Sequence, residues 1–329
     1  MTVEIKTMDF EPKRHTFGHV ARRIGGDKPA SRYQEATLDV QATENFHYRP
    51  LWEPEFWHYD TGKTKVVMED WYKPLDPRQY YYATYNIARA NMNQSVERNF
   101  TFVEDKNLLG KLSDELKQKL IIGLIPARHV HWGSNMNTSE MCQRGYGTAF
   151  TAPCMFSAGD HLGMAQIVSR IGLELDGQTG NGLDKAKDAW MNDKAWQGIR
   201  KLVENTLVQR DFFELFVAQV LGINGVILEA IYNGLDDAWG EASLPISMLS
   251  EFMNDWQKEE ARWSHSTIKI VAAESAENKA IVSAWASDWI NRAEDALRTY
   301  TAAIAGDENI AKTYADKERV TAKSLGLEI

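Results

Sequence analysis

The sequence of 329 residues contains only two cysteines, Cys142 and Cys154, too few to cross-link a small secreted scaffold. It shows no apolar run near the roughly 18 residues that a membrane span needs, and its opening residues, MTVEIKTMDFEPKRH, contain no apolar signal core. It also lacks an excess of basic charge, since 37 Lys and Arg against 46 Asp and Glu give a net charge of −9. This balance argues against nucleic acid or an anionic membrane as the main partner. We therefore expect a cytoplasmic protein with reduced thiols.

Aromatic residues are plentiful: the chain has 11 Trp, 12 Tyr and 12 Phe, more apolar surface than a disordered chain carries. Many lie within residues 1–75, where turn residues separate short aromatic and charged clusters and neither a helical nor a strand period persists. Tyrosine and tryptophan provide much contact area at little entropic cost. We interpret residues 1–75 as an extended N-terminal arm that docks against a partner chain, in preference to an arm that packs only on its own body.

Residues 76–329 have a helical pattern. Asp76-Pro77 has the form of a helix start, with an acidic cap and proline at the first helical position. Apolar residues then recur at steps of three and four from Tyr81 to Val103, which predicts a helix of about 28 residues. No alternating run long enough for a core strand occurs, so we predict an all-α bundle of long helices. Further helices are expected from Ser113 to about Val130 and at 147–173, 195–221, 246–273, 277–304 and 308–324.

The sequence lacks a phosphate-binding glycine loop, a Gly-x-Ser-x-Gly elbow and zinc-type or redox cysteine pairs. A long-helix bundle can still hold a carboxylate-bridged metal pair, which needs a Glu from each of two helices and a Glu-x-x-His from each of two more. Two tetrads come close: Pro126-Ala-Arg-His129 has proline in place of Glu, and Glu260-Ala-Arg-Trp263 has tryptophan in place of His. Neither proline nor an indole binds a metal. We therefore predict a degenerate site, with no metal, cofactor or catalytic residue on this chain.

These tetrads also have an ordinary structural interpretation, since such spacings arise by chance in a helical protein. His129 alone would be a hydrogen-bonded core histidine, and Trp263 belongs to an apolar stripe that runs from Met248 to Ile270. Glu260 fits that interpretation poorly, because a carboxylate on an apolar stripe is costly unless it is paired. We expect Glu260 to be buried and held by an Arg or His from a neighbouring helix.

Four segments, together with the two tetrads, resemble a known family: KPASRYQEAT (28–37), NFHYRPLW (45–52), DPRQYYY (76–82) and NDKAWQGIR (192–200). Nearly the whole chain resembles the β subunit of the bacterial multicomponent monooxygenases, a group that contains phenol hydroxylases, toluene monooxygenases and soluble methane monooxygenase. Within this group the first two segments are most similar to the phenol hydroxylase β subunit, also called component L or P1.

The resemblance implies a ferritin-like bundle and a hydroxylase that is a dimer of αβγ protomers. In this family the α subunit carries the di-iron centre and the substrate pocket, where phenol is hydroxylated to catechol. Electrons come from NADH through a separate reductase, and a small regulatory protein is needed for turnover. The β subunit resembles a duplicated α subunit that kept its helices and lost its ligands, a pattern that Pro126 and Trp263 match. The resemblance therefore transfers no catalytic role to this chain.

In such a complex this chain would support the metal-bearing helices of α and the contacts of the hydroxylase dimer. Two alternatives from other classes remain: a di-iron enzyme that acts alone, whose ligands this sequence lacks, and a stand-alone helical scaffold or binding protein. Within the family, a β subunit of a related toluene monooxygenase is the alternative. The arm is the segment expected to wrap α, through the interface candidates Tyr33, Phe46, Tyr48, Trp52, Phe56, Trp57, Trp71 and Tyr72.

Overall fold

The computed structural model describes residues 13–26, 28–44 and 48–329, and every regular element in these ranges is a helix, which confirms the predicted all-α class. The arm contains α1 (Gly18–Ile24), α2 (Arg32–Thr37) and the 3-10 turn η1 (Thr61–Lys63). The bundle contains α3 (Tyr82–Asp105), α4 (Asp114–Gly123), α5 (Ala127–Arg144), α6 (Thr148–Leu175), α7 (Asn181–Asn192), α8 (Lys194–Thr206), α9 (Phe212–Val217), the π-helix η2 (Ala218–Leu228), α10 (Glu229–Asn233), α11 (Asp236–Trp239), the 3-10 turn η3 (Gly240–Ala242), α12 (Ser243–Leu249), α13 (Glu251–Ala273), α14 (Ala276–Ala305) and α15 (Asn309–Ser324).

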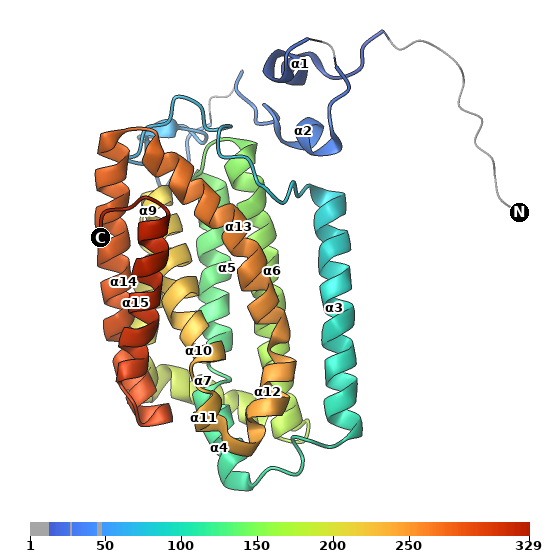
Figure 1. Ribbon diagram of the computed structural model, residues 1–329, viewed down its shortest axis with the longest axis vertical. Coiled ribbons are helices and arrows are strands. Elements are labelled where there is room, and N and C mark those ends of the chain that lie inside the picture. The colour runs from blue at the N-terminus through green and yellow to red at the C-terminus, as the bar shows by residue number, and fades with distance from the viewer. Residues whose placement is uncertain (1–12, 27, 45–47) are drawn as a thin grey trace, which may run out of the picture.

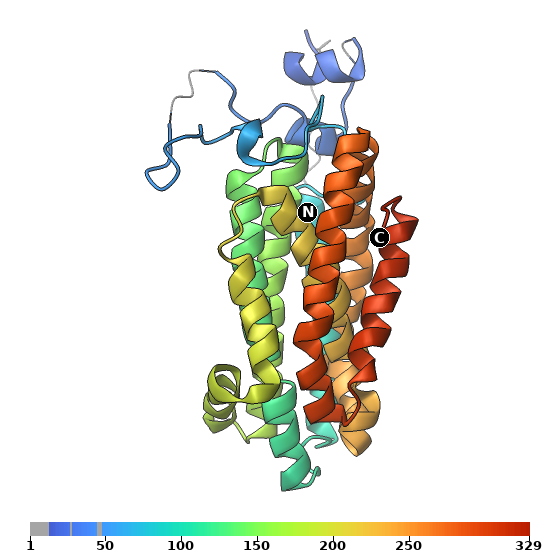
Figure 2. The ribbon, with the colours of Figure 1, turned by 90° about the vertical axis from the view of Figure 1, so that its left-hand side faces the viewer.

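The long helices run side by side along the longest axis of the molecule (Figure 1). α5 and α6 form the most extensively packed helix pair, and α14 packs against α8, η2, α13 and α15. α4 and α7 lie at one end of the bundle, whereas α1, α2 and η1 lie at the other end, as Figures 1 and 2 both show. The turn between α5 and α6 contains Gly147, whose φ of 81° favours glycine. The fold is therefore a bundle with its N-terminal segment gathered over one end.

The bundle encloses one continuous apolar core that is rich in large aromatic side chains. Five tryptophans at its centre are almost completely removed from solvent. Each aromatic side chain buries roughly 150–250 Å², and burial contributes about 25 cal/mol per Å² of apolar surface. These residues account for much of the hydrophobic stabilisation; they are Trp196, Trp239, Trp256, Trp263 and Trp289.

The C-terminal helices confirm their predictions to within a residue or two, but the predicted start at Asp76-Pro77 is wrong. α3 begins only at Tyr82. Asp76 does not cap a helix, because its carboxylate accepts hydrogen bonds from the backbone and the guanidinium of Arg78. An Asp-Pro pair starts a helix only when the following residues are free to continue it, and here they turn toward α13.

Other predicted helices are divided in the structure. The helix expected from Ser113 to Val130 is interrupted before Ala127, because Pro126 has no N–H to continue the ladder. The span 195–221 is interrupted between α8 and α9, the span 246–273 is interrupted at Ser250, and α7 was not predicted. The π-helix η2 also carries no periodic signature in the sequence that distinguishes it from an α-helix.

The continuous segment Phe212–Asn233, formed by α9, η2 and α10, is apolar enough and long enough to cross a membrane by composition alone. The expectation that the chain contains no apolar run of membrane-spanning length is therefore wrong. The most apolar window of this segment is 89% buried within the protein, which is the property of a core helix. Its apolar character is explained by packing against α5, α14 and α15.

The last part of the arm belongs to the bundle core rather than to a separate segment. Trp71 is buried, and its ring centroid lies 5.4 Å from that of Phe212. The backbone N–H of Val67 donates to Asn278 Oδ1 at 2.9 Å, while Asn278 Nδ2 donates to the Val67 carbonyl at 2.8 Å. The predicted boundary at residue 75 therefore lies too late in the chain, because residues from about Val66 onward already contribute to the bundle core.

Candidate functional site

Glu260 lies in a buried ionic cluster between α13 and the segment that precedes α3. Its side chain is only 4% exposed, and Arg78 Nη1 donates to Glu260 Oε2 at 2.8 Å. Arg78 Nε also donates to Asp76 Oδ1 at 3.0 Å, and its guanidinium lies 5.5 Å from the ring centroid of Trp263. Burial raises the pKa of Glu260 to about 7, while the charge of Arg78 opposes this rise. The expected cationic partner is present, but it comes from a loop segment and not from a neighbouring helix.

A second buried ionic cluster fastens α3 to α6 and α13. Arg89 donates from Nε and Nη2 to the two carboxylate oxygens of Asp160, both at 2.7 Å. Arg89 Nη2 also donates to Glu259 Oε1 at 2.9 Å. The remaining lone pairs of Asp160 accept from Tyr85 Oη at 2.9 Å and from Trp256 Nε1 at 2.8 Å. Every oxygen of this carboxylate therefore has a donor, which makes the cluster a fixed cross-link between three helices.

Two histidines face each other in the interior, between α5, α6 and α10. His131 Nδ1 lies 3.1 Å from His161 Nδ1, and His131 Nε2 lies 2.7 Å from Tyr232 Oη. Complete burial lowers the pKa of His131 to about 3 and that of His161 well below its ordinary value, so both rings are neutral. Tyr232 then donates to His131 Nε2, and His131 Nδ1–H donates to His161, because the opposite arrangement leaves the tyrosine proton without an acceptor.

Amide side chains continue this polar interior along the π-helix. Gln219 Nε2 donates to Ser134 Oγ at 2.9 Å and to Asn224 Oδ1 at 2.8 Å. Asn137 Nδ2 donates to Gln219 Oε1 at 2.9 Å. Gln257 of α13 donates to the Asn224 backbone carbonyl at 2.8 Å, which satisfies an acceptor within the π-helix. The interior between α5, η2 and α13 is thus held by neutral hydrogen bonds.

The structure does not bring the two tetrads together. His129 is half-buried in the first turn of α5, and its ring stacks on Trp190 of α7 with centroids 5.5 Å apart. Trp263 instead packs against Phe150, in the first turn of α6, with ring centroids 6.4 Å apart. His129 and Trp263 therefore have different neighbours, and the interpretation of Pro126, His129, Glu260 and Trp263 as positions of one former site stays a prediction.

The inward-facing residues do not fit a carboxylate-bridged metal pair, which requires several carboxylates and two imidazoles with free lone pairs. Asp160 and Glu260 are engaged by arginines, and His131 uses both ring nitrogens within the protein. Across residues 13–26, 28–44 and 48–329, no group of three or more His, Cys, Asp or Glu side chains is arranged to hold a metal ion. That the chain carries no metal stays a prediction, and its direct measurement is described in the Discussion.

Three of the predicted interface residues pack within the chain itself. Tyr33, Trp71 and Tyr72 are all buried, and the Tyr33 hydroxyl accepts from the backbone N–H of Asp76 at 2.8 Å. Their assignment as contacts for a partner is wrong, because aromatic residues in an irregular segment can equally fasten that segment to its own bundle. The composition of the arm did not distinguish the two cases.

The other interface candidates lie farther from the core. Trp52 is 60% exposed, Tyr48 and Trp57 are also exposed, and Phe56 is half-buried. Phe46 lies outside the described residues. Leu51, which was not among the candidates, is 92% exposed beside Trp52. Residues 48–57 therefore present an apolar surface, which we call the arm patch, and its contact with a partner stays a prediction.

A second apolar surface lies on the outer faces of α5 and α6. Trp132 is 51% exposed, and Met136 stands one turn further along α5. Met155 and Leu162 are exposed on α6, which packs beside α5. Large apolar side chains gathered on adjacent helices are typical of a protein interface. The signal for this surface in the sequence is the presence of apolar residues outside the core stripe of two long helices.

The buried polar residues Arg78, Arg89, Asp160, His131, His161 and Tyr232 were also missed. Arg78 lies within the segment DPRQYYY, and Asp160-His161 interrupts a long apolar helix. An acidic residue and a histidine on the buried face of an apolar helix are the signal that would have found this interior. Their partners could not have been found, since the paired residues lie 30 to 182 residues apart in the sequence.

Comparisons with known proteins give several similar chains. The phenol 2-monooxygenase oxygenase component MhpL of Acinetobacter pittii (strain PHEA-2) is 44% identical over 331 residues, covering 100% of this chain and 98% of that protein. The corresponding component DmpL of Pseudomonas sp. (strain CF600) is 45% identical over 298 residues, covering 90% of each chain. The β subunit of the toluene-4-monooxygenase hydroxylase component of Ectopseudomonas mendocina is 23% identical over 313 residues, covering 91% and 94%.

Among solved structures, a chain of xenon-pressurized phenol hydroxylase from Pseudomonas sp. OX1 matches with a TM-score of 0.93 and 42% identity, covering 99% of both chains. A chain of toluene 4-monooxygenase with bound toluene matches with a TM-score of 0.77 and 19% identity, covering 91% of this chain and 100% of that one, which shows the shared fold alone. The sequence model of the family described as Methane/Phenol/Alkene Hydroxylase matches residues 52–275. The chain belongs to the methane/phenol/alkene hydroxylase family.

Proposed function

We propose that this chain is the non-catalytic β subunit of a multicomponent phenol hydroxylase, which converts phenol to catechol with O2 and electrons from NADH. The observation that carries this proposal is the 44% identity, along the whole chain, to a phenol 2-monooxygenase oxygenase component. The identity to the toluene-4-monooxygenase β subunit is 23%, which favours the phenol enzyme over the toluene enzyme. The chain would act in the cytoplasm.

In this proposal the di-iron centre lies on a partner α subunit. Two features of this chain support that assignment: Glu260 and Asp160 are paired with Arg78 and Arg89, and His131 hydrogen-bonds to His161 and to Tyr232. A side chain whose lone pairs are already used cannot ligate a metal without losing those bonds. The role that we propose for this chain is to support the α subunit, and a bundle whose helices are joined by buried ion pairs is suited to that role.

The partners we propose are the α and γ subunits in an (αβγ)2 complex, a small regulatory protein and an NADH-dependent reductase. The similar proteins are named as oxygenase components or as a hydroxylase subunit, which supports an assembly of several chains. The arm patch and the outer surface of α5 and α6 are the apolar faces that α would cover. Covering them would hold the metal-bearing helices of α against a rigid support.

Reconstitution of phenol hydroxylation tests this role. The complete set of components should convert phenol to catechol, and omission of this chain should lower the rate by about a hundredfold, because small displacements of catalytic groups cost that much. This chain alone should be inactive. Equal rates with and without it would contradict the proposal and favour the stand-alone scaffold. Activity of this chain alone would favour a self-sufficient enzyme.

A further inference from the structure

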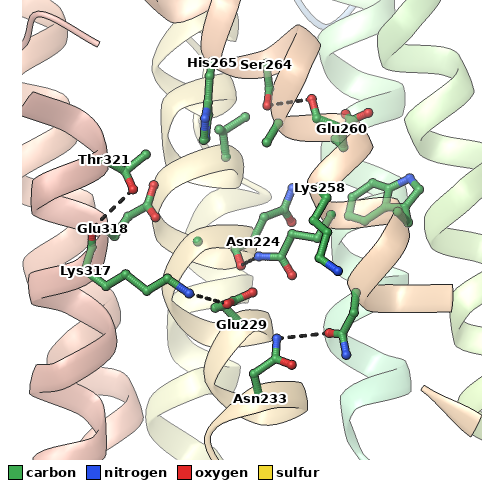
Figure 3. Close-up of a pocket in the computed structure, with 16 residues that line it drawn as sticks. Asn224, Glu229, Asn233, Lys258, Glu260, Ser264, His265, Lys317, Glu318 and Thr321 are labelled. Carbon is green, nitrogen blue, oxygen red and sulfur yellow. Dashed lines mark hydrogen bonds and ion pairs between the residues drawn. The ribbon is translucent and has the colours of Figure 1, made fainter. Parts of the chain in front are cut away.

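A cavity of about 400 Å³ opens between the π-helix η2, α13 and α15, within the size range of small-molecule sites (Figure 3). Its rim carries Lys317 and Asn233, and its inner wall carries Asn224, Ser264 and Glu318. Glu260 forms part of the cavity wall, but the proposed role of supporting α does not use the cavity. Its walls combine apolar surface from Val220 and Trp256 with several hydrogen-bonding groups.

Almost every charge on the cavity wall has a counter-charge. Glu229 Oε1 accepts from Lys317 Nζ at 2.6 Å, and Glu260 is paired with Arg78. Lys258 extends outward toward Asp255, with a distance of 3.5 Å between Nζ and Oδ1. Burial lowers the pKa of His265, so this ring is neutral near pH 7. Glu318 is the acidic group on the wall for which the described chain provides no ion pair.

One oxygen of the Glu318 carboxyl, Oε1, is buried and has no hydrogen-bond partner in the described part of the chain. Glu318 is only 6% exposed. The carboxyl lies against Gly225 of η2, where an added Cβ would approach the Glu318 carboxyl carbon to 2.4 Å. A buried acceptor without a donor costs roughly 1–3 kcal/mol or more. Such a group on the wall of a cavity indicates a ligand that supplies the missing donor and charge.

We propose that this cavity binds a small organic ammonium ion, whose charged nitrogen donates to the Glu318 carboxylate while its apolar part lies against Val220 and Trp256. An ammonium group supplies up to three donors and the counter-charge that the wall lacks. An anion would meet Glu318 and Glu229, and a neutral alcohol would leave the buried carboxylate uncompensated. The pairing of Lys317 with Glu229 keeps that lysine from taking the same place.

Binding should depend on pH in a defined way. Burial raises the pKa of Glu318 to about 8, so the carboxyl is protonated at pH 6 and must release its proton to accept an ammonium ion. An alkylammonium stays charged throughout this range, as a lysine side chain does. Its affinity should therefore rise about tenfold between pH 6 and pH 7 and level off above about pH 8. The other titratable or charged groups on the wall are Glu229, Lys258, Glu260, His265 and Lys317.

Isothermal titration calorimetry of the full chain with n-butylammonium chloride tests the proposal, with 1-butanol and sodium butyrate as isosteric probes. Butylammonium should bind at least tenfold more tightly than either probe. Titrations at pH 6.5 in buffers of different ionisation enthalpy should show about one proton released for each ion bound. The variant Glu318→Gln should lose the preference for the ammonium ion, while Glu308→Gln, at the exposed start of α15, should keep it.

Three results would overturn the proposal. These are no binding of butylammonium at millimolar concentration, equal binding of 1-butanol or butyrate, and ammonium binding that Glu318→Gln leaves unchanged. If Glu318→Gln fails to fold, proton release by the unmodified chain still tests the proposal. Binding of butylammonium elsewhere on the surface would release no proton.

Discussion

Replacement of Arg78 by methionine should lower the free energy of unfolding by about 3–5 kcal/mol, because it leaves buried carboxylates without their counter-charge. Arg78 donates to Glu260 at 2.8 Å and to Asp76 at 3.0 Å, and the side chain of Arg78 is 2% exposed. Urea unfolding followed by circular dichroism measures this loss. The matched control is Arg98→Met, because Arg98 is exposed and donates a hydrogen bond to Ser95, a neutral residue; its effect should stay within about 0.5 kcal/mol.

The cost of Arg78→Met should also increase with pH. Burial raises the pKa of Glu260 from 4.5 to about 7, so its contribution to stability is fully present below pH 4.5 and is lost as pH rises through 7. Removal of Arg78 takes away the charge that opposes the rise in the pKa of Glu260. The loss of stability caused by Arg78→Met should therefore be larger at pH 8 than at pH 5. Glu260→Gln in the Arg78→Met background should recover part of the stability. A cost equal to that of Arg98→Met would show that the cluster is not essential, and a cost that does not change with pH would contradict the role given to the ionisation of Glu260.

Replacement of Trp52 by alanine should weaken the association with the partner α subunit by at least about 2 kcal/mol, roughly thirtyfold in Kd. Exposed tryptophans at the centre of an interface commonly contribute this much, and Trp52 lies beside Leu51 in the arm patch. The stability of the separate chain should change by less than about 0.5 kcal/mol, since the indole is largely in solvent. The dissociation constant is measured with purified α subunit by surface plasmon resonance.

The control for this experiment is Val320→Ala, which removes an exposed apolar side chain from α15, far along the chain from the arm patch. Unchanged affinity for Trp52→Ala would contradict the role of the arm patch. Point substitution is preferable to deletion of residues 1–60, because deletion also removes Glu53. Arg144 Nη1 donates to Glu53 Oε1 at 2.7 Å in a buried contact. Loss of this contact would change the stability of the chain, so an effect on association could not be separated from an effect on stability.

The sequence was most informative where one helix face is buried along its whole length. α6, α14 and α15 agree with their predicted spans closely, since a sustained stripe of core residues at helical spacing has no strand interpretation. Proline had two different effects: Pro126 ends one predicted helix, whereas Pro77 follows a residue that is engaged elsewhere. Local rules cannot separate these cases, because a partner across the fold decides whether Asp76 is free to cap a helix.

The interior of the bundle was predictable in one respect only. Glu260 on an apolar stripe required a cation, and Arg78 provides it. The three-residue spacing of the tetrads is less informative, because spacing places two side chains on one face of a helix but does not say which residues that face contacts. His131 and His161 lie on different helices and are 30 residues apart in the sequence, so their contact depends on the packing of α5 against α6.

Metal analysis of the separated subunits tests the central claim most directly. The hydroxylase is purified with all its subunits, the chains are separated under mild conditions, and the iron of each is measured together with its Mössbauer spectrum. The account predicts about two irons for each α subunit and none bound to this chain. A bridged iron pair within this chain would contradict the account, since it would require Asp160, Glu260 and the two histidines to exchange their present partners for a metal.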